Sequence, residues 1–217
     1  MPEWLLHTYF RSSASFRVRI ALNLKGIAYA SESHHLQRGE QRSPGYLLIN
    51  PQGLVPSLRT PDGSIIRQSM AIVEYLDAVV EVGPRLIPAD SLSAARVRAI
   101  AQDIACDLHP INNLQVLNYL RDELELNNEA VRVWVQHWIH KVFGPLESEL
   151  AGSDQAGEFC VGCGPTLADL CLVPQIFNAM RFDVDMRAYP RLVSINERCM
   201  KMPEFRDAAP DAQPDAA

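Results

Sequence analysis

The sequence predicts an α/β domain followed by an all-helical domain. The first part of the chain alternates short apolar runs with amphipathic stretches, which is typical of strands and helices packed on a mixed sheet. The rest shows helical periodicity and follows a linker over residues 81–92 that is rich in turn-forming residues. A chain of 217 residues, 47% of them hydrophobic, is long enough for two small domains, which we place at residues 1–82 and 90–217.

The α/β domain is expected to begin with a strand, a hydroxyl-rich turn and a helix. Residues 4–10 form an apolar run typical of a strand, and Val18 and Leu22 then share a helical face that ends at Gly26, a typical C-terminal stop. Residues 11–15 (Arg-Ser-Ser-Ala-Ser) place hydroxyls and free N–H groups at the helix N-terminus, where positive partial charge accumulates. Such a turn suits an anion, including a thiolate. The alternative is that these serines only cap the helix.

The remaining elements of this domain follow from apolar alternation and turn chemistry. We expect a strand over 27–30 with a polar continuation to 36, an irregular segment over 37–54, strands over 57–60 and 64–67, and a helix over 70–80. Pro61-Asp62-Gly63 is a typical hairpin turn, and Gln68-Ser69 is expected to cap the helix. The order β-α-β, loop, β-β-α is that of a thioredoxin-like domain.

The second domain is expected to consist of long helices. We predict helices over 92–107, onward to about 124 after an interruption at Pro110, over 128–150, and after a capping box at residues 166–169. The first of these carries an apolar face that could pack against a two-fold mate, made of Ala95, Val97, Ile100 and Ile104. The tail over 208–217 is rich in Ala, Pro and Asp and is expected to be loosely ordered.

Composition excludes several classes of partner. A formal charge of −6 gives no reason to expect nucleic acid or an anionic membrane. No apolar run approaches the ~20 residues of a transmembrane helix, and the N-terminus lacks a basic leader with an apolar core. We therefore expect a soluble, cytoplasmic protein.

The cysteines do not predict a disulfide framework or a redox centre. Their number is five, which is odd, and a chain of this size does not need disulfides. Cys106 and Cys171 stand in apolar helical contexts and are expected in the core. Cys160 and Cys163 have redox-motif spacing, but they follow no N-terminal strand and have no second pair to complete a zinc site, so we interpret the spacing as coincidental.

The histidines do not predict a metal centre either. His137 and His140 share a helix face but lack a third ligand of identifiable spacing, and His34-His35 stands in a polar strand end or loop. We assign no metal. After His109-Pro110 the residues Asn112, Asn113 and Gln115 form a polar patch at a helix break, a pattern that is structural about as often as functional.

The string RSSASFRVRIAL over residues 11–22 resembles the SSCxxRVRIAL signature of the zeta class of glutathione transferases, the maleylacetoacetate isomerases. The resemblance extends over residues 4–214, and its other matching segments lie at 50–56, 68–76, 107–114, 166–175 and 189–190. The 107–114 segment is also similar to glutathione-dependent maleylpyruvate isomerases. The resemblance implies the glutathione transferase fold, glutathione as cofactor, a homodimer, and a cis proline at Pro56.

The same resemblance implies a role for residues of the first domain. Ser12 matches the serine that hydrogen-bonds the glutathione sulfur, with Ser13 beside it as a second donor. Gln41 matches a position near the glycyl end of glutathione, and Val55 matches one that pairs with its cysteinyl backbone. The rest of the implied glutathione contacts in this domain are Ala14, Ser15, Phe16 and Arg17 in the turn and Gln68 and Ser69 at the helix N-terminus, which would hold the γ-glutamyl carboxylate.

Residues of the helical domain are implied as well. His109, Asn113 and Gln115 match positions that reach towards glutathione. Arg11, from the first domain, and Arg181 are the cations that we assign to the carboxylates of the substrate, because a planar guanidinium suits a carboxylate. Ala14 stands where the family usually has cysteine, which removes any role for a protein thiol there.

The implied activity is the isomerisation of maleylacetoacetate to fumarylacetoacetate by reversible thiolate addition to the double bond, a step of aromatic amino acid degradation. Three alternatives share the fold: a maleylpyruvate isomerase, a transferase that conjugates or dehalogenates small electrophiles, and a binding module without catalysis. The presence of Ser12, Gln68 and Ser69 argues against the last, because a pure interaction module does not need them.

Overall fold

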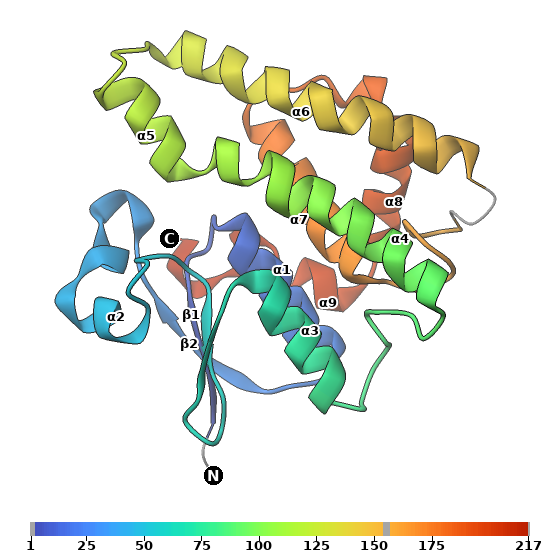
Figure 1. Cartoon of the computed structure of the whole chain (residues 1–217), viewed down its shortest axis with the longest axis horizontal. Helices are drawn as coiled ribbons and strands as arrows, with labels where there is room; N and C mark the ends of the chain where they lie inside the picture. Colours follow the sequence, from blue (N-terminus) through green and yellow to red (C-terminus); the bar gives the residue numbers. More distant parts are fainter. Residues whose placement is uncertain (1–2, 154–156, 217) are drawn as a thin grey trace. The chain divides into compact units, whose positions relative to one another are not determined.

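The chain folds into two units, each with its own core (Figure 1). The computed structural model describes residues 3–153 and 157–216. One unit comprises Met1–Ile87 together with Met200–Ala217, and the other comprises Pro88–Cys199. The change from one unit to the next at residues 87 and 88 falls inside the predicted linker.

The first unit is built on a four-stranded mixed sheet. Its strands lie in the order β2-β1-β3-β4 and are β1 (Trp4–Thr8), β2 (Tyr29–Ser33), β3 (Ser57–Arg59) and β4 (Ile65–Arg67). β1 runs parallel to β2 and antiparallel to β3, with Leu6 opposite Leu58. Helix α1 (Ser13–Leu24) makes the crossover that a parallel pair requires. This arrangement confirms the predicted thioredoxin-like domain.

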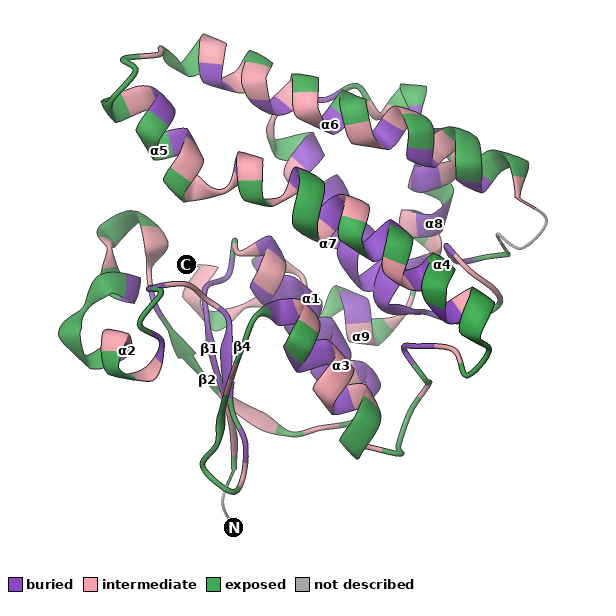
Figure 2. Cartoon of the chain, in the orientation of Figure 1, coloured by how far each residue is buried: buried purple, intermediate pink, exposed green. Residues whose placement is uncertain are grey.

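Helices cover both faces of this sheet. α1 and α3 (Ser69–Val79) pack against each other on one side, and the short helix α2 (Pro44–Ile49) lies on the other (Figure 1). Both α1 and α3 carry buried residues, coloured purple in Figure 2, among them Val18, Leu22, Ile72 and Leu76. The sequence predicted an irregular segment where α2 occurs. A six-residue helix is too short to show periodicity, although Ser43 at its N-cap and Pro44 at its first position are the expected start signals.

The C-terminal residues belong to the first unit, which corrects the prediction that residues 90–217 form one helical domain. The predicted loose tail is also wrong, because α9 (Pro203–Arg206) is followed by 3₁₀ turns and Ala208 is fully buried. Two polar side chains of α1 hold the tail: Arg19 donates from Nε to the Ala208 carbonyl at 2.8 Å, and Asn23 donates from Nδ2 to the Glu204 carbonyl at 3.0 Å. Buried donors need acceptors, and here the tail carbonyls supply them. Because the paired residues are 181 and 189 positions apart, no local sequence pattern predicts that the tail docks on α1.

The second unit consists of helices, and its described residues form no strand. They are α4 (Ser91–Gln102), α5 (Leu114–Asp122), α6 (Asn128–Gly152), α7 (Leu167–Arg181) and α8 (Pro190–Met200). Pro110 interrupts the chain as predicted, but the preceding α-helix ends earlier than predicted, and Asp103–Leu108 is a π-helical segment. The predicted capping box is confirmed, because Asp169 accepts the Thr166 N–H at 2.8 Å at the start of α7.

Two expectations about the second unit are wrong. Three of the four residues of the predicted apolar face, Val97, Ile100 and Ile104, are buried within this unit, where α4 and the segment after it pack against α7, so they are not available to a two-fold mate. The fourth residue, Ala95, is exposed. Cys106 lies in the π-helical segment and is exposed, which corrects the expectation that it is in the core, whereas Cys171 is buried as predicted. All five cysteines are free thiols.

A buried ion pair connects the end of α1 to α3. Its carboxylate also binds the backbone at residues 86–87, just before the second unit begins. Lys25 Nζ lies 2.7 Å from Asp77 Oδ1, and both side chains are at least 96% buried. Asp77 also accepts the N–H groups of Leu86 and Ile87 at 2.8 and 3.0 Å. Burial acts to raise the pKa of Asp77, but these hydrogen bonds and the ammonium outweigh it and hold that pKa below its ordinary value.

We predict that Asp77→Ala lowers the free energy of unfolding by about 3–5 kcal/mol, because it leaves the buried Lys25 ammonium without a counter-ion, with the Val80 carbonyl at 3.2 Å as its remaining acceptor. A carboxylate whose folded pKa is lowered stabilises the fold above its unfolded pKa of about 3.9. The wild type should therefore lose this contribution as the pH falls below that value, and the variant should show less acid dependence. Denaturant unfolding across pH measures both effects.

The matched control is Asp211→Ala, which removes an exposed carboxylate of the same unit. It should change the free energy of unfolding by no more than about 0.5 kcal/mol. Equal effects of the two variants would contradict the role given to the ion pair.

Candidate functional site

Ser12 lies at the junction of β1 and α1, the strand and helix that position it. It is the N-cap of α1, and its Oγ accepts the N–H of Ser15 at 3.1 Å. Its side chain is half-buried, whereas Ser13 and Ser15 are buried. The structure therefore confirms the capping interpretation of Ser12 without excluding the other one. The cap uses the oxygen as an acceptor, which leaves the hydroxyl hydrogen able to donate to a ligand.

The turn that carries Ser12 is held from inside by Arg19. This side chain is 1% exposed, and its guanidinium donates to the carbonyl oxygens of Phe10 and Ala208 at 3.0 and 2.8 Å and to the Thr8 hydroxyl at 3.1 Å. Burial lowers the pKa of Arg19 to about 10, so it stays protonated at neutral pH. No role is predicted for Arg19 from the sequence. Its position on the buried face of a predicted helix is the one sequence feature that could have indicated a buried structural cation.

Asp215 holds the same turn from outside. Its Oδ2 accepts the Phe10 N–H at 3.0 Å and also accepts a short hydrogen bond from the Ser33 hydroxyl. The carboxylate thus ties the C-terminal tail to the β1–α1 turn and to the end of β2. No sequence signal marked this residue, because its partners lie 182 and 205 positions away.

A second group of predicted residues meets at the N-terminus of α3. Arg17 is 1% exposed, and its Nη1 donates to the Ser69 hydroxyl at 3.3 Å. Its Nε and Nη2, and the Ser15 Oγ, are buried without a hydrogen-bond partner among the described residues. Gln68 precedes the helix with a φ of 70°, and its hydroxyl-bearing neighbour Ser69 opens the helix. A buried guanidinium beside a helix N-terminus is a site for an anion such as a carboxylate.

The loop before β3 is the third predicted part of the site. The Val55–Pro56 peptide is cis, as predicted. Tyr46 Oη and Asn50 Nδ2 both donate to the carbonyl of Leu54, at 2.6 and 2.7 Å, and so fix the loop just before this peptide. Gln41 is buried, and its Oε1 has no partner among the described residues.

Arg11, Ala14 and Phe16 complete the predicted residues of the first unit. The Arg11 side chain is exposed, with its guanidinium 5.0 Å from the centre of the Phe10 ring. Phe16 is buried in the core of the unit, so its side chain packs and does not line a surface. Ala14 is half-buried in the first turn of α1.

The other predicted residues belong to the second unit. Asn113 is the N-cap of α5 and accepts the Gln115 N–H at 3.0 Å, and His109 follows the π-helical segment. Arg181 ends α7, with its guanidinium 5.9 Å from the centre of the Phe182 ring. His109, Asn113 and Gln115 therefore surround a break in the helix, as predicted, and their binding roles stay predictions.

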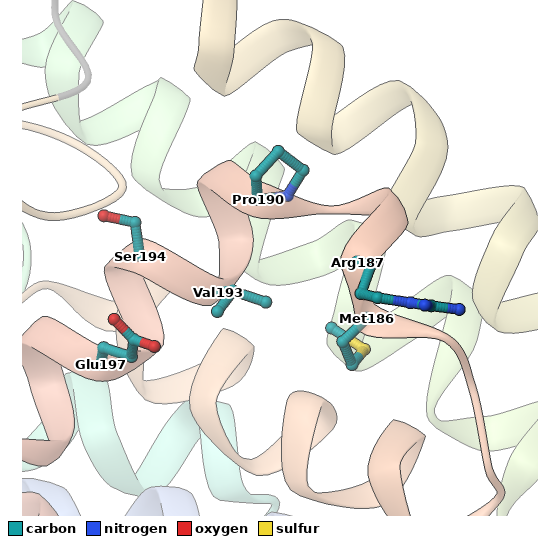
Figure 3. A pocket seen from close by; sticks show the side chains of 6 residues that line it. All are labelled: Met186, Arg187, Pro190, Val193, Ser194 and Glu197. Atoms are coloured by element: carbon teal, nitrogen blue, oxygen red, sulfur yellow. The ribbon is translucent and has the colours of Figure 1, made fainter.

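A hollow of about 350 Å³ lies on the second unit around the start of α8 (Figure 3). Its lining residues are Met186, Arg187, Pro190, Val193, Ser194 and Glu197. Arg187 is paired with Asp185 at 2.7 Å, so its charge is already balanced. No predicted site residue lines this hollow.

In addition, none of the described helices is long and apolar enough to cross a membrane.

Comparisons with known proteins agree on one family. A model of the glutathione S-transferase N-terminal domain matches residues 11–79. The chain is 48% identical to a probable maleylacetoacetate isomerase of Vibrio cholerae, over 100% of both chains. It is 42% identical to a maleylpyruvate isomerase of a Ralstonia species, over 98% of this chain and 99% of the relative.

Solved structures give the same result. A zeta-class maleylpyruvate isomerase, solved in its holo form, superposes with a TM-score of 0.95 at 42% identity, over 98% of this chain and 100% of the other. A maleylacetoacetate isomerase of Methylobacterium extorquens, solved with malonate and glutathione, superposes with a TM-score of 0.94 at 37% identity, over 98% and 99% of the two chains.

We predict that Asp215→Ala loosens the β1–α1 turn without unfolding the unit. A hydrogen bond to a charged acceptor contributes about 1.5–3 kcal/mol, so the Phe10 amide hydrogen should exchange with solvent roughly 10- to 150-fold faster. Hydrogen exchange followed by NMR measures this rate. Asp211→Ala, on the same tail, is the control and should leave it unchanged. If Asp215→Ala leaves the Phe10 rate unchanged as well, the tail does not hold the turn.

Proposed function

Because this chain belongs to the zeta class of glutathione transferases, we propose that it is a glutathione-dependent cis–trans isomerase that converts maleylacetoacetate to fumarylacetoacetate. The observation that carries this proposal is the pair of groups at adjacent helix N-termini: the Ser12 hydroxyl at α1, and the buried Arg17 guanidinium with Ser69 at α3. Full-length relatives named as maleylacetoacetate isomerases support the choice of substrate.

The residues present fit glutathione. Two guanidinium nitrogens of Arg17 and the Ser15 Oγ are buried and without a partner among the described residues, and the α3 N-terminus adds N–H groups and positive partial charge. These groups would hold the γ-glutamyl carboxylate. Gln68 lies beside them, Val55 would pair with the cysteinyl backbone, and Gln41 would contact the glycyl end. His109, Asn113 and Gln115 are proposed as further contacts.

When bound, glutathione supplies a thiolate that adds reversibly to the cis double bond, which becomes single, rotates and re-forms as trans. The part of this chain is to favour the anionic form of the sulfur. The Ser12 hydroxyl can donate to it while its oxygen keeps the cap, and the α1 N-terminus adds a positive partial charge. Ser13 is buried and is the second proposed donor.

Substrate carboxylates require cations. Arg11 precedes Ser12 in the sequence, and its side chain is exposed. Its guanidinium can therefore reach a carboxylate of a substrate that approaches Ser12 from solvent. Arg181 is the second proposed cation. Both would also orient the substrate and stabilise negative charge that develops on its carbonyl oxygen. Neighbouring solved structures contain malonate and citrate, which are carboxylates of the expected kind.

Maleylpyruvate is the second candidate substrate, because a relative and a close structural neighbour are named maleylpyruvate isomerases. The test assays purified enzyme with each substrate and glutathione. We expect a higher kcat/KM for maleylacetoacetate. The opposite order would assign the enzyme to maleylpyruvate. Thioether release without isomerisation would make it a conjugating transferase, and no turnover with retained glutathione binding would make it a binding module. A homodimer in the cytoplasm is part of the proposal.

We predict that Ser12→Ala lowers turnover by roughly 10- to 150-fold, because a hydrogen bond to a charged partner contributes about 1.5–3 kcal/mol at about 1.4 kcal/mol per decade. It should also lower the free energy of unfolding by about 1 kcal/mol, because the cap is lost. Steady-state kinetics and thermal unfolding measure the two effects. Ser13→Ala should have the smaller effect on turnover.

The matched control is Asn127→Ala, which removes the cap of α6, where the Asn127 side chain accepts the Ala130 N–H at 2.9 Å. It should lose similar stability and keep its turnover. If Ser12→Ala behaves like this control, Ser12 is a cap only and has no part in catalysis.

We predict that Arg17→Met raises the KM for glutathione by at least roughly 10-fold, because one charge-assisted hydrogen bond contributes about 1.5–3 kcal/mol. The KM for the cis substrate that the enzyme isomerises should change far less. Arg59→Met is the control, because Arg59 is an exposed cation of the same unit on β3. An unchanged glutathione KM in a folded Arg17→Met enzyme would remove Arg17 from the glutathione site.

A further inference from the structure

Two histidines and a glutamate (His7, His34 and Glu32) meet beside Tyr46 of α2. Figure 1 shows α2 on the side of the sheet opposite α1. His7 of β1 stands opposite Glu32 in the parallel register of β1 and β2. His34 follows two residues after Glu32, and its N–H continues the pairing by donating to the Thr8 carbonyl at 2.8 Å. Residues that alternate by two along a strand share a face, so the three side chains point the same way.

The ligand atoms of this cluster are spaced as a metal ion would hold them. His7 Nδ1 and His34 Nε2 are 3.0 Å apart, and each lies 3.7 Å from an oxygen of Glu32. Two ligands at about 2.1 Å from one zinc ion, at angles between about 90° and 110°, are about 3.0–3.4 Å apart. The imidazoles already meet this requirement. A small rotation of the Glu32 side chain, which is 55% exposed, would bring one carboxylate oxygen into the same range.

The chemistry of the three groups suits the same ion. His7 and His34 are 2% and 7% exposed, and burial acts to lower the pKa of both imidazoles. Without an ion, His7 Nδ1 and His34 Nε2 share a hydrogen bond, so one of these two nitrogens carries a proton. On metal binding that proton moves to the other nitrogen of its ring, both facing nitrogens offer lone pairs, and the carboxylate adds the negative charge that a divalent cation favours. Tyr46 of α2 packs its ring 4.2 Å from the His34 ring and 5.5 Å from the His7 ring, which limits how far either imidazole can swing.

We propose that His7, Glu32 and His34 bind one zinc ion, with solvent water as the fourth ligand on the exposed side of Glu32. Two histidines with one glutamate are a known donor set for zinc sites that keep one open position. The ion would tie the edge strand β2 to β1. This proposal is independent of the isomerase activity. It also changes the interpretation made from the sequence, from which we assigned no metal, because the spacing from His7 to Glu32 matches no metal-binding motif.

The test is an equilibrium titration of the full chain with zinc sulfate against a chromogenic zinc chelator. The protein is first freed of glutathione, whose thiol binds zinc. A Cys106→Ser, Cys163→Ser background removes the two exposed thiols. We expect one equivalent of zinc. Glu32→Gln and His34→Asn should each weaken binding by at least roughly 10-fold. At the same zinc concentration, zinc should raise the Tm of the parent protein more than that of Glu32→Gln.

The matched control is His137→Asn, which removes an exposed histidine of the α6 pair. It should leave affinity and stoichiometry unchanged. Because Glu32 is half exposed, Glu32→Gln should fold even if His34→Asn does not. The proposal is overturned if no zinc binds, if Glu32→Gln binds as tightly as the parent, or if His137→Asn accounts for the loss instead.

Discussion

The buried guanidinium of Arg19 is the interaction on which the first unit depends. It stands under the junction of β1 and α1 and donates to backbone carbonyls of Phe10 in the turn and Ala208 in the C-terminal tail. A charge this far from water is tolerated only because these acceptors surround it. The β1–α1 turn and the tail are therefore one structure, and Asp215 closes it from outside through the Phe10 N–H. Ser12 is positioned as the first residue after this fixed turn.

The placement of charge around that turn supports the proposal that the first unit holds an anionic peptide. Arg17 points to the N-terminus of α3 and keeps two donor nitrogens without a partner among the described residues. Arg19, only two residues later, donates hydrogen bonds from all three of its guanidinium nitrogens, to the carbonyls of Ala208 and Phe10 and to the Thr8 hydroxyl. Of these two neighbouring arginines on one helix, Arg19 holds the fold and Arg17 is the one that we propose binds the ligand. Arg11 is the third of the series and faces solvent.

Much of the fold could be predicted from the sequence, because periodicity and turn residues report local structure. The β-α-β and β-β-α order, the break at Pro110 and the capping box at Thr166 were all visible in this way. The docking of residues 200–217 was not, because it depends on pairings across the length of the chain. For the site, the motif indicated Ser12 and Arg17, but only the structure reveals that Asp215 supports the turn and that His7 meets His34.

We propose that Ser12 lowers the pKa of the glutathione thiol, and titration of that thiol in the binary complex measures this effect. The ultraviolet absorbance of the thiolate, followed across pH, gives the value for wild type and for Ser12→Ala. A free cysteine thiol has a pKa of about 8.5. We predict a clearly lower value in the wild-type complex and a return towards the free value in Ser12→Ala. Equal values in the two complexes would contradict the account.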